Sequence, residues 1–206
     1  DARVAGMLSR KAGIVVVHMG DGKDGLKLIN EVLERTDIPI RIIRPTHVNR
    51  KEELLLEAYD YAKKGGIIDF TCGIKKDTSP TKSVLMAEEK GVPLENITIS
   101  SDGYGSWSRY DEYGNMIEIG VSPVNSLYNE FKSMVLEYDF DLEKALQFYT
   151  INVAKALKLY PRKGAIKENS DADLIIIDDN MEINTVIANG KVMLDEGRII
   201  VKGTYE

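Results

Sequence analysis

Cysteine is almost absent from this sequence, whose 206 residues include one, Cys72. A single cysteine cannot form a disulfide within the chain, so a small disulfide-stapled scaffold is excluded. This sparing use of cysteine suits a reducing compartment, and we predict a cytoplasmic protein. Long apolar runs are missing too, because no stretch approaches the roughly 18–20 residues that a membrane-spanning helix needs. We therefore predict no membrane association.

An excess of basic residues is also lacking, since 27 Lys and Arg face 33 Asp and Glu, for a net charge of −6. This balance argues against a protein that binds the phosphate backbone of nucleic acids. Small molecules are the expected partners. The opening residues, DARVAGMLSRKAG, contain no methionine start and no apolar stretch of signal-peptide length. Because Val4, Met7 and Leu8 have helical spacing, we predict that the sequence enters in mid-helix as part of a longer protein.

Residues 1–160 have the pattern of repeated strand, loop and helix. Short β-branched runs predict buried parallel strands, and amphipathic stretches between and after them predict helices. The predicted strands are 14–17, 40–43, 67–71 and 97–100; the predicted helices are 26–33, 51–64, 81–90, 124–138 and 141–157. Repeats of this kind indicate parallel βα units. Four of them form either half of an eight-stranded barrel or a small doubly wound sheet.

Residues 161–206 change in character, with short apolar runs separated by turn sequences. The predicted strands are 173–178, 185–188, 191–194 and 198–201. Asn189-Gly190 is a strong signal for a two-residue hairpin, because both residues tolerate positive φ. We predict a small antiparallel β element that must pack against another part of the protein.

The sequence has two histidines, and each stands at the end of a predicted strand region. His18 directly follows the first predicted strand, His47 lies in the RPTHVNR segment into which the second apolar run leads, and Asp102 follows the fourth strand. Reactive groups in parallel α/β proteins gather at the carboxyl ends of the strands, so these three side chains are expected to converge. Imidazole nitrogens and a carboxylate suit zinc and similar divalent ions. A lone histidine after a strand is usually an ordinary hydrogen-bonded loop residue, and Asp-Gly is a common turn pair, so the metal-site hypothesis depends on the three residues together.

Two histidines and one carboxylate do not complete a two-metal centre. Either the site holds a single metal ion, or further ligands lie upstream of Asp1. Cys72 ends the third strand, where a thiolate facing the ion is one interpretation and a packed, unreactive side chain is the other.

Four segments carry a resemblance to a known family: IVVVHMGD at 14–21, RPTHVNR at 44–50, KGGIIDFT at 64–71 and TISSDGYGS at 98–106. They resemble the isoaspartyl (β-aspartyl) dipeptidases, a branch of the amidohydrolase superfamily of binuclear-metal barrels. The resemblance implies that residues 1–160 are the second half of a TIM-like (β/α)8 metallo-hydrolase barrel, with strands five to eight. It implies that residues 161–206 are part of a small β-sandwich domain.

The resemblance also implies roles for individual residues. His18 and His47 correspond to metal ligands after strands five and six, and Asp102 to the aspartate after strand eight that binds the other metal and handles the proton of the attacking water. Arg50 corresponds to the arginine that pairs with a substrate carboxylate, and Ser106 to a serine that contacts the aspartyl end. Without the resemblance, Arg50 is equally a solvated loop residue and Ser106 a turn or cap residue.

The family's remaining ligands, a His-x-His pair and a carboxylated lysine, and its tyrosine and glutamate at the substrate site are absent here. We therefore expect an active site with two zinc ions that is completed by an amino-terminal half, an inactive chain in isolation, and a homo-oligomer of the complete chain. The predicted activity is metal-dependent hydrolysis of the β-aspartyl amide bond of dipeptides. The alternatives are another amidohydrolase reaction, by a cyclic amidase or a deaminase, and a non-catalytic half-barrel binding or assembly module.

Overall fold

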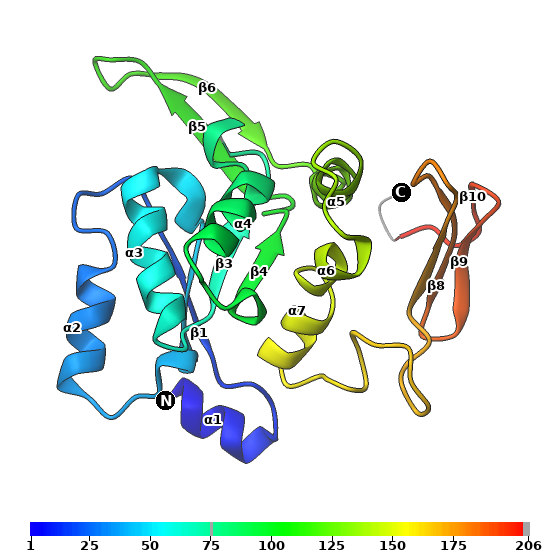
Figure 1. The fold of residues 1–206 in the computed structure, drawn as a ribbon, viewed down its shortest axis with the longest axis horizontal. Helices are drawn as coiled ribbons and strands as arrows, with labels where there is room; N and C mark the ends of the chain where they lie inside the picture. The colour runs from blue at the N-terminus through cyan, green and yellow to red at the C-terminus, as the bar shows by residue number, and fades with distance from the viewer. Residues whose placement is uncertain (75, 204–206) are drawn as a thin grey trace.

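The computed structural model describes residues 1–74 and 76–203, so the last three residues of the predicted 161–206 segment lie outside the described part. Figure 1 shows a parallel sheet with helices around it, a projecting hairpin and a separate antiparallel sheet near the carboxyl end. The helices are α1 Ala2–Ser9, α2 Lys27–Arg35, α3 Glu52–Lys63, α4 Pro80–Glu89, α5 Ser126–Leu136, α6 Leu142–Gln147 and α7 Ile151–Ala156. Short 3-10 helices are η1 Ile40–Ile42, η2 Val48–Arg50, η3 Lys76–Thr78 and η4 Leu94–Asn96. The strands are β1 Val15–His18, β2 Ile43–Thr46, β3 Ile68–Thr71, β4 Ile97–Ser100, β5 Ser106–Tyr110, β6 Met116–Val121, β7 Leu174–Ile177, β8 Ile183–Ala188, β9 Lys191–Asp195 and β10 Arg198–Ile199.

The four predicted βα units form one parallel sheet in the order β1-β2-β3-β4. The pairing joins Val15 to Ile43 and Ile68 to Ile97, whereas β2 and β3 pair at Thr46 and Asp69 alone. Neighbours in the sheet are thus neighbours in the sequence, without the reversal of order that defines a doubly wound sheet. The α/β prediction is confirmed, and of its two versions the doubly wound one does not fit the described strands.

The core lies between the sheet and the helices that cover it, with buried residues from α2, α3, α4, α5 and α6. Helix α3 buries Leu54, Leu55 and Ala58 on one face, as the spacing of its apolar residues predicts. It ends before Gly65, whose φ of 91° a glycine adopts without strain. The Tyr59 hydroxyl donates a 2.6 Å hydrogen bond to the carbonyl of Ser83 and so ties α3 to α4. These contacts fix the strand ends that carry the site.

Two of the predicted elements were wrong in detail. Residues 40–42 form η1 instead of a strand, because Ile42 N–H turns back to the carbonyl of Pro39 at 2.9 Å, and β2 starts only at Ile43. The predicted helix 141–157 is two helices, α6 and α7. The chain leaves helical geometry at Thr150 (φ −125°, ψ −85°), and the carbonyl of Phe148 accepts a hydrogen bond from Ile99 of β4 instead. Local apolar patterns do not reveal such tertiary hydrogen bonds.

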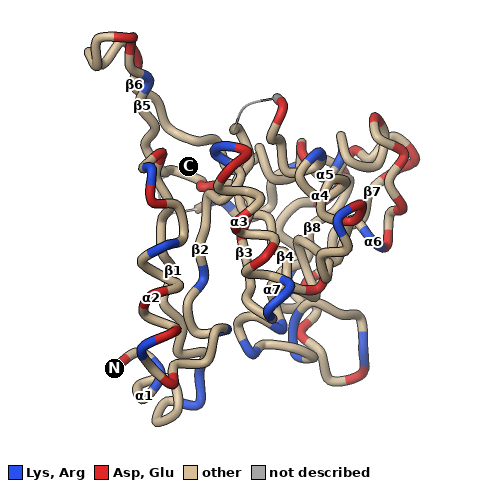
Figure 2. The backbone as a smooth tube through the Cα atoms, turned by 60° about the vertical axis from the view of Figure 1, so that its left-hand side comes forward, with Lys and Arg blue, Asp and Glu red and all other residues tan. Residues whose placement is uncertain are grey.

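The hairpin β5–β6 was not predicted at all. It projects from the body in both overall views (Figures 1 and 2), and its side chains are mostly exposed. The turn is closed by Asp111, whose carboxylate accepts from the backbone N–H groups of Tyr113 and Asn115 at 2.9 and 2.8 Å. The YGN turn between two alternating segments is the signal that would have found it.

The carboxyl-terminal strands form a single antiparallel sheet in the order β10-β9-β8-β7. The predicted hairpin at Asn189-Gly190 is confirmed, with φ of 50° and 76°. This sheet packs against α5: the Tyr128 hydroxyl donates to the carbonyl of Met181 at 2.7 Å, and Met181 itself is buried. The predicted β-sandwich stays a prediction, since these strands make one sheet.

No helix in the described ranges is long and apolar enough to cross a membrane. Figure 2 shows acidic and basic residues interspersed over the described chain, whose sequence has a net charge of −6.

Candidate active site

The two histidines meet at the carboxyl end of the sheet. His18 ends β1, and its register partner is Thr46, the residue before His47. This register places His18 Nδ1 2.8 Å from His47 Nε2. This is a hydrogen-bond distance, so in this arrangement one of the two nitrogens carries a proton and donates it to the other. Neutral imidazole is a common ligand of divalent metal ions, which makes the pair a candidate for metal binding once that proton is released.

His47 is held from its other side by a hydroxyl. Its Nδ1 lies 2.7 Å from Thr71 Oγ1 at the end of β3, and the side chain is 4% exposed. Burial lowers the pKa of His47, the neighbouring charge of Asp102 opposes this, and the positive charges of Arg50 and His18 reinforce it. The imidazole is consequently favoured in the neutral form, which is the form that binds metal.

Two site residues adopt left-handed backbone conformations that side chains other than glycine rarely take. They are His47, with φ of 62°, and Asp102, with φ of 52°. Such a conformation costs about 1–3 kcal/mol per residue and persists only where the surroundings impose it. In both cases the chain turns sharply as it leaves a strand, which keeps the side chain at the strand end.

The loop after β4 is shaped around the carboxylate of Asp102. Gly105 N–H donates to the carbonyl of Asp102 at 2.8 Å. A Cβ on Gly105 would lie 2.7 Å from Asp102 Oδ1 and 2.8 Å from its carbonyl oxygen, closer than atoms can pack. A glycine is therefore required at this position of the DGYGS segment if Asp102 is to keep its place.

One cavity brings the sequence-predicted site residues together. It is lined by His18, Met19, Gly20, Asp21, His47, Arg50, Asp102, Gly105 and Ser106. The predicted convergence of these strand ends is thus what the structure shows. In the described ranges, however, no three His, Cys, Asp or Glu side chains are arranged to hold a metal ion. The assignment of His18, His47 and Asp102 as a ligand set stays a prediction.

Arg50 and Ser106 occupy different environments within this cavity. Arg50 ends η2, and its Nε is buried without a hydrogen-bond partner among the described residues. A buried guanidinium nitrogen with no partner is costly unless a ligand meets it, and a carboxylate matches its geometry. Ser106 is the exposed first residue of β5, so its hydroxyl is accessible to a ligand.

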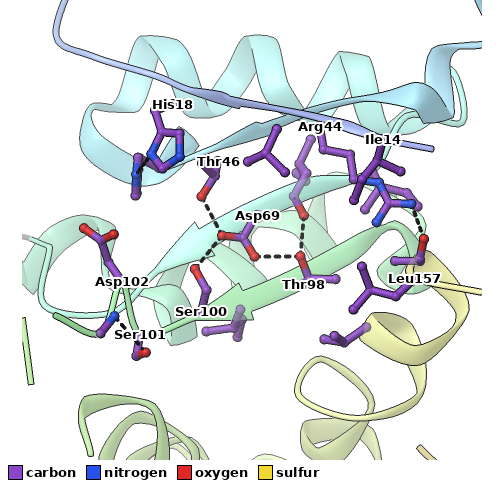
Figure 3. A pocket seen from close by; sticks show the side chains of 18 residues that line it. Ile14, His18, Arg44, Thr46, Asp69, Thr98, Ser100, Ser101, Asp102 and Leu157 are labelled. Carbon is purple, nitrogen blue, oxygen red and sulfur yellow. Dashed lines mark hydrogen bonds between the residues drawn. The ribbon is translucent and has the colours of Figure 1, made fainter. Parts of the chain in front are cut away.

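A half-buried carboxyl, that of Asp69, joins three strands. Asp69 on β3 accepts hydrogen bonds from the hydroxyls of Thr46 on β2 and of Thr98 and Ser100 on β4, at 2.7, 2.7 and 2.6 Å (Figure 3). Burial raises the pKa of Asp69, although these three hydroxyls act to lower it. Because Thr46 precedes His47 and Ser100 lies two residues before Asp102, this network fixes both strand ends.

Removing this carboxyl should destabilise the protein. We expect Asp69→Ala to lower the free energy of unfolding by about 2–4 kcal/mol, because the buried hydroxyls of Thr46 and Thr98 and the half-buried hydroxyl of Ser100 lose this acceptor. Asp69→Asn, which keeps the shape and one acceptor, should cost less. Urea unfolding measures both, and an unchanged Asp69→Ala variant would contradict the role of the network.

The same carboxyl predicts a pH dependence. Since the folded-state pKa of Asp69 is raised, the folded protein binds the proton more tightly than the unfolded chain does. The contribution of this group to stability is therefore greatest below the unfolded pKa of about 3.9 and falls as the pH rises towards the folded pKa. The stability gap between wild type and Asp69→Asn should widen on acidification.

Cys72 follows β3 as a buried residue, and burial raises the pKa of its thiol to about 12. The thiol therefore stays protonated near neutral pH and is a poor metal ligand. Of the two interpretations of this residue, the structure supports the packed, unreactive side chain.

Three residues around the site were not singled out from the sequence: Asp69, Thr71 and Asn49. A charge inside the otherwise apolar IIDF run is the signal that would have marked Asp69, because an acid there needs buried partners. Thr71 and Asn49 carry no comparable local signal, since their partners come from different loops.

Comparison with known proteins defines the class. Residues 16–193 match the amidohydrolase family, and this chain belongs to that family. A β-aspartyl dipeptidase from the thermophilic, keratin-degrading Fervidobacterium islandicum AW-1, solved in complex with a β-Asp-Leu dipeptide, is 35% identical. That match covers 98% of this chain and 54% of the dipeptidase, with a TM-score of 0.91.

Two further matches complete the comparison. A second structure of a β-aspartyl dipeptidase from the same organism is 34% identical, covers 98% of this chain and 51% of its own, and has a TM-score of 0.84. Adenine deaminase 4 from Rhizobium meliloti (strain 1021) is 40% identical over 60 residues, which are 28% of this chain and 10% of the deaminase. This chain thus spans about half the length of the dipeptidase structures.

Proposed function

We propose that this chain supplies one half of the active site of a metal-dependent β-aspartyl dipeptidase. The observation that carries the proposal is the single cavity shared by the histidine pair, Arg50, Asp102 and Ser106. It is supported by the 35% identity to a dipeptidase solved with a β-aspartyl dipeptide. The unpartnered Nε of Arg50 favours a substrate with a carboxylate.

We further propose that the barrel and the metal centre are completed by a segment that precedes Asp1. At one edge of the parallel sheet, β1 pairs with β2 alone among the described strands, and Val15 and Val16 on β1 are 41% and 49% exposed. Apolar edge strands are usually covered or paired. "Extended protein" below means this chain together with that segment.

His18 Nδ1 and His47 Nε2 would hold one of two zinc ions, with Asp102 as a ligand of the other, and the remaining donors would come from the preceding segment. Divalent metal ions bound here would supply Lewis acidity towards the carbonyl of the β-aspartyl amide. A pair of neutral imidazoles suits zinc.

The residues of this chain would perform the remaining tasks. Asp102 would accept the proton of the attacking water and return it to the leaving amine, acting as a general base and then as a general acid. Arg50 would bind a terminal carboxylate of the dipeptide through two parallel hydrogen bonds. Ser106, beside Gly105, would contact the aspartyl end.

A substrate panel tests this proposal. We expect the zinc-loaded extended protein to release aspartate from β-Asp-Leu but not from α-Asp-Leu, and to lose this activity after chelation and regain it with added zinc. Amino-acid analysis of the products measures the cleavage. A protein that cleaves neither dipeptide at any metal content would contradict the proposal.

A deaminase is the second candidate, and the 60-residue match to an adenine deaminase is the observation that favours it. Adenine and a cyclic amide therefore belong in the same panel. Ammonia release from adenine, or ring opening of the cyclic amide, without dipeptide cleavage would favour these alternatives.

A further inference from the structure

The hydroxyl of Thr71 contacts the ring nitrogen of His47 that faces away from His18. The distance from Thr71 Oγ1 to His47 Nδ1 is 2.7 Å, and both side chains are buried. A metal ion at the histidine pair would need the lone pair of His47 Nε2, so the ring proton must then sit on Nδ1. Among the described residues, Thr71 Oγ1 is the acceptor within hydrogen-bond distance of that proton.

Thr71 is in turn held in place by the side chain of Asn49. Asn49 Oδ1 accepts from Thr71 N–H at 2.8 Å, and Asn49 Nδ2 donates to the Thr71 carbonyl at 3.1 Å. The same Nδ2 donates to the carbonyl of Thr78 at 2.8 Å. Asn49 is fully buried, so these hydrogen bonds are shielded from competing water.

Asn49 takes the place of a neighbouring strand. β2 stops at Thr46, where the left-handed His47 turns the chain away from β3. The backbone groups of Thr71 would then lack a partner on that side, and the side-chain amide of Asn49 presents the same donor and acceptor as a peptide group. The His-Val-Asn sequence therefore has two effects. The left-handed backbone at His47 places its imidazole in the site, and Asn49 anchors Thr71, which contacts that imidazole.

We infer that Thr71 is a positioning residue that sets the tautomer of His47, and that Asn49 locks Thr71 in the position from which it does so. The inference rests on the proposed function in that it takes His47 to be a metal ligand. A hydroxyl suits the task because it can accept from Nδ1–H in the loaded site and rotate to donate in the empty one. Partners of this kind orient ligating histidines and raise metal affinity.

Metal affinity measured without any dipeptide tests the inference. In the extended protein, Thr71→Val removes the hydroxyl with little change of shape, and we expect zinc binding about 10–100-fold weaker in competition with a chelator. Thr71→Ser keeps the hydroxyl and should restore affinity to within about threefold of wild type. Zinc affinity unchanged in Thr71→Val would overturn the inference.

Thr81→Val is the matched control, because Thr81 is an equally buried threonine whose hydroxyl donates to Glu130 at 2.6 Å, away from the histidines. Thermal unfolding of all variants separates the roles. If Thr71→Val and Thr81→Val weaken zinc binding equally, Thr71 has no more than a structural role and the inference is wrong.

A second measurement needs no variant. In zinc-loaded wild type with ¹⁵N-labelled histidine, NMR should show the His47 proton on Nδ1, and a proton on Nε2 would contradict the inference. Weaker zinc binding in Thr71→Val together with no cleavage of β-Asp-Leu by wild type would uphold this inference while the proposed substrate failed.

Discussion

Replacing Asp102 with asparagine is expected to lower kcat for β-Asp-Leu by about 10²–10⁴-fold in the extended protein, the usual size of a general acid–base contribution. Asparagine has the same shape, so it fits the turn in which Gly105 approaches the side chain. It cannot accept the proton of the attacking water. Steady-state kinetics at equal zinc content measure the loss.

Asp111→Asn is the control for this change. Asp111 is an aspartate of the same chain at the exposed hairpin turn, remote from the cavity lining, and its substitution should leave kcat near the wild-type value. Near-normal turnover in zinc-loaded Asp102→Asn would refute the proton-transfer role of Asp102. This conclusion does not depend on whether Asp102 is also a metal ligand.

Changing Arg50 should act on substrate binding instead. Because lysine presents a single ammonium in place of the planar fork, Arg50→Lys is expected to lower kcat/KM for β-Asp-Leu by about 10–100-fold, mainly through KM. This corresponds to the loss of one charge-assisted hydrogen bond. Arg50→Met, which removes the charge as well, should lose more.

A substrate without the terminal carboxylate sharpens this prediction. This substrate is β-Asp-Leu with its leucine carboxylate replaced by a carboxamide. The extended wild-type protein should cleave it poorly, and the Arg50→Lys variant should cleave it no worse than wild type does. If Arg50→Lys lowers kcat/KM equally for both substrates, Arg50 does not bind that carboxylate.

The elements of the fold that could be predicted are those with a local sequence signal, namely the spacing of apolar residues or a turn motif. Four short apolar strands with helices between them predict the parallel sheet, and the Asn189-Gly190 turn predicts the hairpin of the antiparallel sheet. Elements set by tertiary hydrogen bonds were missed. Helical periodicity of the apolar residues continues across the break between α6 and α7, so it does not predict that break. The break arises where the Phe148 carbonyl accepts a hydrogen bond from the backbone of β4.

The site shows the same division. His18, His47 and Asp102 could be predicted to converge because parallel strands end at one edge of a sheet. The supports of these residues could not. Asp69 needs hydroxyls from two other strands, and Asn49 acts through the backbone of β3. Both depend on pairing register, which one sequence does not specify by local pattern.

Zinc content and β-Asp-Leu cleavage, measured in this 206-residue chain and in the extended protein, test the divided active site most directly. We predict about two zinc ions and cleavage in the extended protein, and neither in the shorter chain. Zinc binding and cleavage by the 206-residue chain alone would contradict this prediction, and would place a self-sufficient site around His18, His47 and Asp102.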